Sequence, residues 1–227
     1  MNDIEKNLQQ VHLQIRQQCE ASGRSPDEVT LLAVSKTKPV SDIMQAYAQG
    51  QRDFGENYLQ EAEQKITALA GKDIIWHYIG PIQSNKTHKI SELFDWVHSV
   101  DRLKIARHLS RHRPPDRKPL NILLQINIDN EASKSGIPLD NMLPLAHDIA
   151  QLPHLMLRGL MAIPAVRQDF AAQREPFGKM HDALERLKQH YPQCDCLSMG
   201  MSSDMQAAIA EGSTLVRIGT AIFGARA

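Results

Sequence analysis

Residues 30–49 read TLLAVSKTKPVSDIMQAYAQ, and this stretch sets a pattern that the rest of the chain repeats. Its first part, residues 30–35, is short, apolar and rich in Leu and Val, which is typical of a strand buried on both faces. Residues 41–49 follow with apolar side chains at helical spacing, and Ser41 is a favoured residue for opening a helix. A buried strand followed by an amphipathic helix is the repeating unit of a parallel sheet.

The same unit recurs along the whole chain. Runs rich in Val, Ile and Leu predict eight strands, at residues 30–35, 52–54, 74–79, 96–99, 121–127, 156–162, 196–199 and 215–218. Amphipathic stretches predict helices at residues 3–21, 41–49, 58–69, 84–93, 102–111, 139–151, 168–190 and 204–210. We expect a single (β/α)8 TIM-type barrel with an extra N-terminal helix, and a doubly wound open sheet is the lesser alternative.

Composition bounds the class of protein. A length of 227 residues suits one domain over residues 1–227, and 42% apolar residues can fill a large core. Lys plus Arg and Asp plus Glu are balanced at 26 each, which disfavours nucleic acid and acidic membranes as partners. No basic segment followed by an apolar run opens the chain, and no long apolar stretch occurs. We therefore expect a cytoplasmic protein that binds a small molecule. We also expect a monomer, because a barrel closes on itself.

Several features are interpreted as structural. The three cysteines are an odd number, and Cys194 and Cys196 are spaced for neither a disulfide nor a metal pair. The ten histidines show no metal-ligand spacing, so we expect no metal site. The basic residues between 102 and 118 lack interleaved aromatics, and we interpret them as a solvated helix face and surface loop.

Lys36 is the main candidate for chemistry. It follows the first predicted strand, and strand alternation places it on the same face as Leu32 and Val34. If those two residues point into the barrel, Lys36 points into its mouth. Partial burial lowers the pKa of a lysine and favours the free amine that forms a Schiff base with an aldehyde. The alternative is a lysine that only extends to the rim and into solvent.

The ends of the last two predicted strands suggest an anion site. Residues 197–204 (LSMGMSSD) offer hydroxyls and helix-start amides around Ser202, and residues 216–220 (VRIGT) offer Gly219 and Thr220. The loops after strands seven and eight often bind phosphate in barrels. Arg217 shares a face with Leu215 and Gly219, so it also points inward if Gly219 lines the site, toward a ligand or into a structural ion pair. For Ser202, Gly219 and Thr220 the alternative is an ordinary role as a helix cap or a turn residue. Asn57 and Ser84 could likewise be no more than helix N-caps.

These residues lie in segments that together resemble a known family. The segments are LLAVSKTKP (31–39), FGENY (54–58), WHYIGPIQSNK (76–86), SKSG (133–136), RGLMAIP (158–164), LSMGMSSD (197–204) and VRIGTAIFG (216–224). In these segments, which span nearly the whole chain, the sequence resembles the pyridoxal phosphate homeostasis proteins, whose fold is similar to the barrel domain of alanine racemase. Seven motifs in register are far more specific than any one of them.

The resemblance implies roles for the candidate residues. Lys36 would carry pyridoxal 5′-phosphate as a Schiff base, and Ser202, Gly219 and Thr220 would bind its phosphate. Arg217 would face the pyridine nitrogen, and Asn57 would lie near the ring. An arginine can only donate to that nitrogen and leaves it unprotonated, which weakens the electron sink needed for carbanion chemistry.

Two classes of function remain at this point. The first is a non-catalytic protein that binds pyridoxal phosphate, keeps the free pool low and passes the cofactor to apo-enzymes. The alternative is a pyridoxal-phosphate-dependent enzyme such as a weak amino-acid racemase. Alanine racemases resemble this chain only in the barrel and carry a further domain with a second acid/base tyrosine, which Tyr58, Tyr78 or another protomer would have to replace here. We therefore expect the binding protein, with no catalytic residue.

Overall fold

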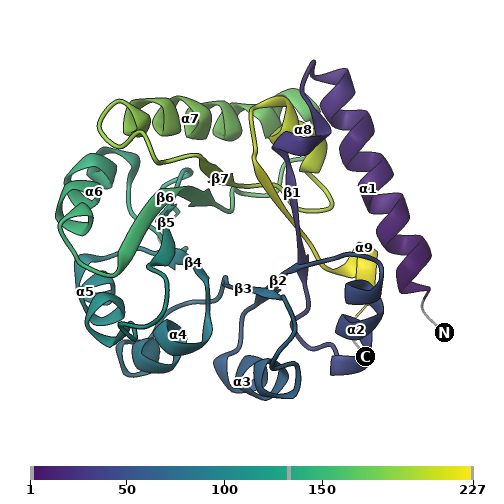
Figure 1. The fold of residues 1–227 in the computed structure, drawn as a ribbon. Helices are drawn as coiled ribbons and strands as arrows, with labels where there is room; N and C mark the ends of the chain where they lie inside the picture. The colour runs from purple at the N-terminus through teal and green to yellow at the C-terminus, as the bar shows by residue number, and fades with distance from the viewer. Residues whose placement is uncertain (1–2, 132–133, 226–227) are drawn as a thin grey trace.

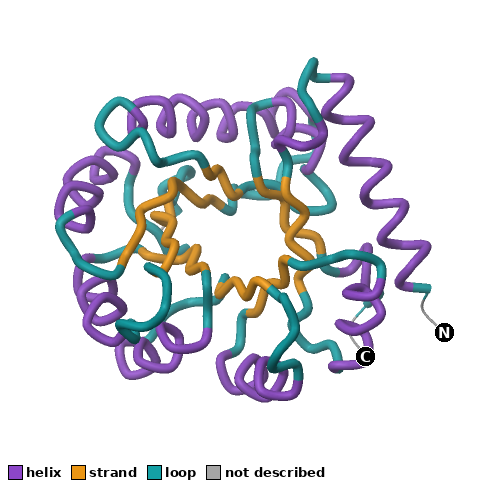
Figure 2. Tube along the Cα trace, viewed as in Figure 1, coloured by secondary structure: helices purple, strands orange, loops and turns teal. Residues whose placement is uncertain are grey.

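The computed structural model describes residues 3–131 and 134–225, and it confirms the predicted barrel. Eight parallel strands pair in chain order and close into a ring, because β8 pairs with β1 as well as with β7. The strands are β1 (Thr30–Val34), β2 (Asp53–Glu56), β3 (Ile75–Tyr78), β4 (Trp96–Val100), β5 (Leu120–Ile126), β6 (Leu155–Ala162), β7 (Cys196–Ser198) and β8 (Leu215–Ile218). Figure 2 shows them as a central ring with the helices outside.

A helix lies in every crossover between consecutive strands. The α-helices are α1 (Ile4–Ala21), α2 (Val40–Ala48), α3 (Leu59–Ala68), α4 (Thr87–Leu93), α5 (Leu103–His112), α6 (Met142–Ala150), α7 (Phe170–Lys188), α8 (Met205–Ala210) and α9 (Thr220–Phe223). Three short 3₁₀ turns span Pro26–Glu28, Ser84–Lys86 and Leu139–Asn141. Within the described residues, no helix combines the length and the apolar character that crossing a membrane requires.

The extra N-terminal helix packs against the outside of the barrel. Helix α1 contacts α2, α8 and α9, and Figure 1 shows it along that side of the ring. Its buried face contains Ile4, Leu8, Val11 and Ile15, which recur at the spacing of one face of an amphipathic helix. Asp3 caps the helix by accepting a hydrogen bond from the Lys6 amide at 3.0 Å. The helix therefore covers the region where the first and last strands meet.

The predicted boundaries are wrong in places where local residues mislead. Strand β2 extends to Glu56 and not only to residue 54, because Gly55 and a charged residue resemble a turn in the sequence. In the structure Gly55 lies inside the barrel, where an added Cβ would be 3.2 Å from Leu32 Cδ2, and Glu56 is fully buried. The predicted helix 84–93 begins as a 3₁₀ turn, and the short helix α9 was not predicted.

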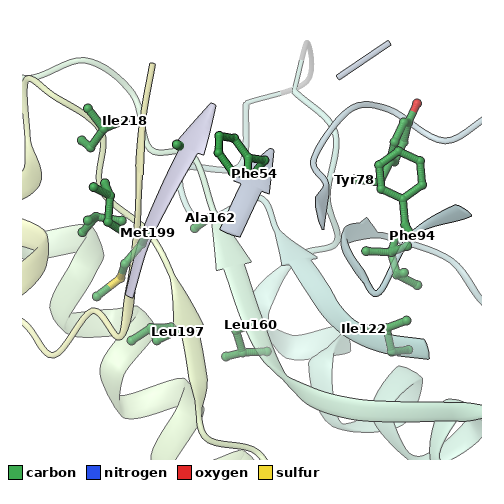
Figure 3. Close-up of a cluster of buried hydrophobic side chains, with 14 of the residues drawn as sticks. Phe54, Tyr78, Phe94, Ile122, Leu160, Ala162, Leu197, Met199 and Ile218 are labelled. Carbon is green, nitrogen blue, oxygen red and sulfur yellow. The ribbon is translucent and has the colours of Figure 1, made fainter. Parts of the chain in front are cut away.

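Two apolar layers stabilise the barrel. The larger one lies between the strands and the helices, and Figure 3 shows Phe54, Ile122, Leu160 and Leu197 contributing to it from four strands. The smaller one fills the inside of the ring and consists of Leu32, Leu123, Met161, Cys196 and Leu215. Since Leu32 and Leu215 point inward, strand alternation also directs Lys36 and Arg217 toward the inside.

The interpretation of the basic stretch as fully solvated is wrong for Arg113. This side chain is only 4% exposed and donates to the carbonyl oxygens of Ser91, Phe94 and Lys118 at 2.6, 2.7 and 2.9 Å. Burial lowers its pKa to about 10. Arg113 thereby ties the loop between α5 and β5 to α4.

Candidate functional site

A cavity of about 400 Å³ lies at the carboxyl ends of the strands, on the side where barrels bind their ligands. All six residues predicted from the sequence line it: Lys36, Asn57, Ser202, Arg217, Gly219 and Thr220. The remaining lining residues are Ser203 and the apolar Val34, Ile79, Met161, Ile163 and Met201. The cavity thus combines an apolar wall with a few polar groups, which is typical of small-molecule sites.

Lys36 lies two residues beyond β1, in a turn with a strained backbone. The next residue, Thr37, has φ of 63°, a left-handed conformation that is uncommon for a β-branched residue. Glu61 accepts a hydrogen bond from the Thr37 amide at 2.5 Å and so holds this turn. Strain of this kind persists where neighbouring groups fix it, and it is frequent at functional sites. The turn therefore presents the half-buried Lys36 to the cavity in a defined way.

A buried ion pair supports the turn from behind. Lys65 Nζ donates to Glu56 Oε1 and to the Ser35 carbonyl, both at 2.8 Å, and it also pairs with Glu61. Ser35 Oγ donates to Glu56 Oε1 at 2.6 Å. Burial raises the pKa of Glu56, while Lys65 and Ser35 oppose that shift. Sequence reasoning missed this group, although Glu61 and Lys65 are spaced four residues apart on a predicted helix.

Asn57 lies after β2 and does not cap a helix. Tyr58 is the residue at the N-terminus of α3, so the interpretation of Asn57 as an N-cap is wrong. The Asn57 Oδ1 atom is buried and accepts no hydrogen bond from the described residues, although a buried polar atom normally has a partner. Gly80 permits this position, since an added Cβ there would be 2.1 Å from the Asn57 carbonyl oxygen. Ser84 likewise makes no side-chain cap; Gln83 precedes its 3₁₀ turn.

The residues of the predicted anion site lie in two turns, one after β7 and one after β8. Ser202 and Ser203 are exposed in the first turn, and no described residue accepts a hydrogen bond from their amides. Asp204 Oδ1 accepts from the Met201 amide at 2.6 Å and fixes that turn. In the second turn, Gly219 lies so close to β1 that an added Cβ would be 3.1 Å from the Val34 carbonyl oxygen. Residues of both turns therefore line the same cavity.

Arg217 lies at the bottom of the cavity and is 5% exposed. Its guanidinium donates to the Ser198 carbonyl at 2.7 Å, to Ser198 Oγ at 2.8 Å and to the Ala162 carbonyl at 2.9 Å. Burial lowers its pKa to about 10. Neutral acceptors hold this arginine, and no carboxylate of the described residues forms a salt bridge with it, so the alternative of a structural ion pair is wrong.

Beneath Arg217 the barrel interior contains His77, His98 and Ser198, all buried. Sequence reasoning missed them as a group and treated the histidines as scattered. Alternation from the inward-facing Ile79, Trp96 and Cys196 would have placed all three inside the ring.

A second, smaller cavity of about 280 Å³ adjoins the first and shares Asn57, Ile79 and Ile163 with it. Lys134 and Ser135 of the SKSG motif line this cavity, whereas Ser133 of that motif lies outside the described residues. The two tyrosines that were considered as a second acid/base do not line the main cavity. The hydroxyl of Tyr78 is buried and donates to the Pro81 carbonyl at 3.1 Å, and Tyr58 is 50% exposed.

Comparisons with known proteins agree with this architecture. The sequence matches the family described as alanine racemase, N-terminal domain, over residues 6–227. It is 56% identical over 227 residues to the pyridoxal phosphate homeostasis protein of Pasteurella multocida (strain Pm70), covering 98% of this chain and 97% of that protein. It is 55% identical over 229 residues to the protein of the same name from Escherichia coli (strain K12), covering 100% and 98%.

A solved structure extends the comparison to three dimensions. PipY of Synechococcus elongatus PCC7942, determined with PLP bound, is similar with a TM-score of 0.83 and 36% sequence identity, covering 98% of this chain and all of that one. The similarity in sequence extends over both chains from end to end, and the similarity in structure covers the whole barrel. The chain therefore belongs to the family of pyridoxal phosphate homeostasis proteins.

Proposed function

We propose that the protein binds pyridoxal 5′-phosphate in the 400 Å³ cavity as a Schiff base on Lys36 and takes part in intracellular pyridoxal phosphate homeostasis. The names of its relatives and the PLP bound to PipY support the ligand. The observation that carries the proposal is the meeting of Lys36 with a hydroxyl- and amide-lined turn and an inward arginine in one cavity. Delivery of the cofactor to apo-enzymes is part of the proposal.

The residues that line the cavity suit both the aldehyde and the phosphate of this ligand. When bound, pyridoxal phosphate supplies an aldehyde that condenses with an amine to an imine and releases one water molecule. Lys36 would provide that amine, and Ser202, Gly219 and Thr220 would bind the phosphate. Val34, Ile79 and Met161 offer an apolar wall for a flat ring. The buried Asn57 Oδ1, which lacks a partner among the described residues, is an acceptor available to a ligand donor.

Two features favour binding over catalysis. Arg217 donates and cannot accept, so it leaves the ring nitrogen unprotonated and stabilises a carbanion poorly. Tyr78, one candidate for a second acid/base, donates to a backbone carbonyl, and burial raises its pKa to about 12. We propose no catalytic residue, and a weak amino-acid racemase is the alternative that an assay must exclude.

The decisive experiment is borohydride reduction of the protein loaded with pyridoxal phosphate, followed by peptide mapping. The label should appear on Lys36, and Lys36→Ala should lose the imine absorption while remaining folded. Lys38→Ala is the matched control, because Lys38 is two residues away and donates to the Ala225 carbonyl at 2.7 Å. Labelling of Lys38 with an unlabelled Lys36 would overturn the assignment.

The choice between binding and catalysis has its own test. The loaded protein should reactivate a separate apo-enzyme and should not interconvert L- and D-alanine faster than free cofactor does. Racemisation at about 1 s⁻¹ or faster, lost in Lys36→Ala, would overturn the binding hypothesis.

We further propose that the protein is cytoplasmic and works as one barrel domain, residues 1–227, in a monomer. The molar mass measured by light scattering during size-exclusion chromatography would test whether the protein is a monomer.

A further inference from the structure

One hydrogen-bond chain crosses the barrel interior beneath Arg217. Arg217 Nη1 donates to Ser198 Oγ at 2.8 Å, and Ser198 Oγ is 3.0 Å from His98 Nδ1. His98 Nε2 is 2.9 Å from His77 Nδ1, and His77 Nε2 is 2.9 Å from Asp53 Oδ1. The five side chains come from β8, β7, β4, β3 and β2, so the chain connects strands around the ring.

The far end of the chain opens at the opposite face of the barrel. Asp53 and His77 line a third pocket, of about 330 Å³, together with Trp96 and Thr214, near the amino ends of the strands. We call this pocket the floor pocket. The Asp53 side chain is 23% exposed there, whereas His77, His98 and Ser198 are 1%, 0% and 0% exposed. The chain therefore runs from a solvent-accessible carboxylate to the residue at the bottom of the ligand cavity.

The carboxylate end of this chain fixes its direction when both histidines are neutral. An arginine only donates hydrogen bonds, an ionised carboxylate only accepts them, and a neutral imidazole has one donor and one acceptor nitrogen. His77 therefore donates from Nε2 to Asp53 and accepts at Nδ1 from His98 Nε2. His98 Nδ1 is then an acceptor, so Ser198 Oγ, which accepts from Arg217, donates its own proton to it. With both histidines neutral, every bond is satisfied only in this arrangement.

The surroundings of His98 agree with its neutral state in this arrangement. His98 is fully buried, and this burial, with His77 and Arg217 nearby, lowers its pKa well below the usual value. His77 stacks on Trp96, with ring centroids 5.5 Å apart and 10° between the planes. The Arg158 Cζ atom lies over the Trp96 ring, 4.9 Å from its centroid. This packing holds the His77 ring in the orientation that the chain requires.

We infer that Ser198, His98, His77 and Asp53 act as positioning residues for Arg217, through one hydrogen-bond chain whose donors all point toward the floor of the barrel. A hydroxyl that donates to an imidazole becomes a better acceptor, so each bond strengthens the next. The Asp53 carboxylate thereby helps to hold Arg217 in place from the opposite face. The consequence for the cofactor rests on the proposed function, in which Arg217 faces the ring nitrogen.

The first test reads the direction of the chain in protein without added cofactor. Nitrogen NMR of the ¹⁵N-histidine-labelled protein should show a proton on Nε2 and a bare Nδ1 for both His77 and His98. In Asp53→Asn the Nδ1 resonance of His98, one ring beyond the contacted histidine, should move. Glu28→Gln should leave it unchanged, because Glu28 lies near the floor pocket but pairs with Arg24 and not with His77. A proton on His98 Nδ1 in the unaltered protein, or an unmoved resonance in Asp53→Asn, would refute the inference.

The second test measures coupling to the cofactor. Asp53→Asn should weaken pyridoxal phosphate binding by about two- to tenfold, the usual contribution of one hydrogen bond. In a Ser198→Ala background, where the chain is cut, Asp53→Asn should have no further effect, whereas independent sites would give additive losses. Additive losses in variants that circular dichroism shows to be folded would overturn the coupling. The NMR result stands whether or not the cofactor binds, so failure of the proposed function is distinguishable from failure of this inference.

Discussion

Ser202 and Thr220 come from two separate turns and line the same main cavity. If they bind phosphate, Ser202→Ala and Thr220→Ala should each weaken pyridoxal phosphate binding roughly ten- to hundredfold, because a charge-assisted hydrogen bond contributes roughly 1.5–3 kcal/mol. Binding of pyridoxal, which lacks the phosphate, should stay the same. Absorption titrations with both ligands measure this, and equal losses for both would argue against a phosphate site.

The Glu56–Lys65 pair is a second feature that depends on single residues. Both side chains are buried, so Lys65→Met leaves an uncompensated carboxylate and should lower the free energy of unfolding by about 3–5 kcal/mol. The double variant Glu56→Gln/Lys65→Met removes the buried charge and should recover much of the loss. Urea denaturation of the single and double variants provides the comparison. A single variant as stable as the unaltered protein would show that the pair does not stabilise the fold.

At the residue scale, side chains in loops at the strand ends are easier to predict from the sequence than side chains that contact one another inside the barrel. Lys36, Ser202 and Thr220 could be predicted to lie around one cavity because each follows a strand, and the carboxyl ends of all strands in a barrel converge. The Asp53–His77–His98 series was not found, because its members are spread over three strands and share no spacing. Only the closure of the ring brings them into contact.

At the element scale, helix α1 offers a matched pair of leucines. Leu8 is 1% exposed against the barrel, whereas Leu13 on the same helix is 44% exposed. Leu8→Ala should lower the free energy of unfolding by about 2–5 kcal/mol, because it leaves a cavity beneath the helix. Leu13→Ala should change it by no more than about 0.5 kcal/mol. Chemical denaturation tests both, and a similar loss in the two variants would mean that α1 is held by something other than this face.

The strands and helices were predicted because each strand is an apolar run and each helix has an apolar stripe, both of which depend on local sequence. Their ends were less accurate. The end of β2 was missed since Glu56 is stabilised by Lys65, nine residues away on the next helix, and this partner cannot be seen in the strand itself. Helix α9 has four residues, too few for a periodic pattern.

For the whole molecule, buried thiol and phenol groups stay protonated at an alkaline pH at which the unfolded chain would lose these protons. Burial raises the pKa of Cys194, Cys196 and Tyr78 to about 12. The unfolded chain loses these protons at a lower pH, so the stability they contribute is complete below about pH 8.5 and is lost as the pH rises toward 12. The free energy of unfolding, followed by circular dichroism in urea, should therefore fall steeply between pH 9 and 11.

The same burial predicts slow thiol chemistry. Cys19, Cys194 and Cys196 are free and buried, and only the thiolate reacts with disulfide reagents. In the folded protein none should react with a chromogenic disulfide at pH 8, and all three should react once guanidinium unfolds the chain. Rapid reaction of any one in the folded state would contradict its placement.

The β1–β8 ladder joins residues that are almost the whole chain apart, from Thr30 with Leu215 to Ala33 with Ile218. Closing so long a loop costs conformational entropy, so this seam is among the most non-local contacts that folding must make. The main cavity lies across it, with Lys36 following β1 on one side and Gly219 and Thr220 following β8 on the other. A ligand that contacts both sides links β1 to β8 like a clasp. By mass action its binding raises the apparent stability of the closed ring. Hydrogen exchange of the amides in β1 and β8 should then slow when the clasp is in place, which makes this seam a local reporter of occupancy.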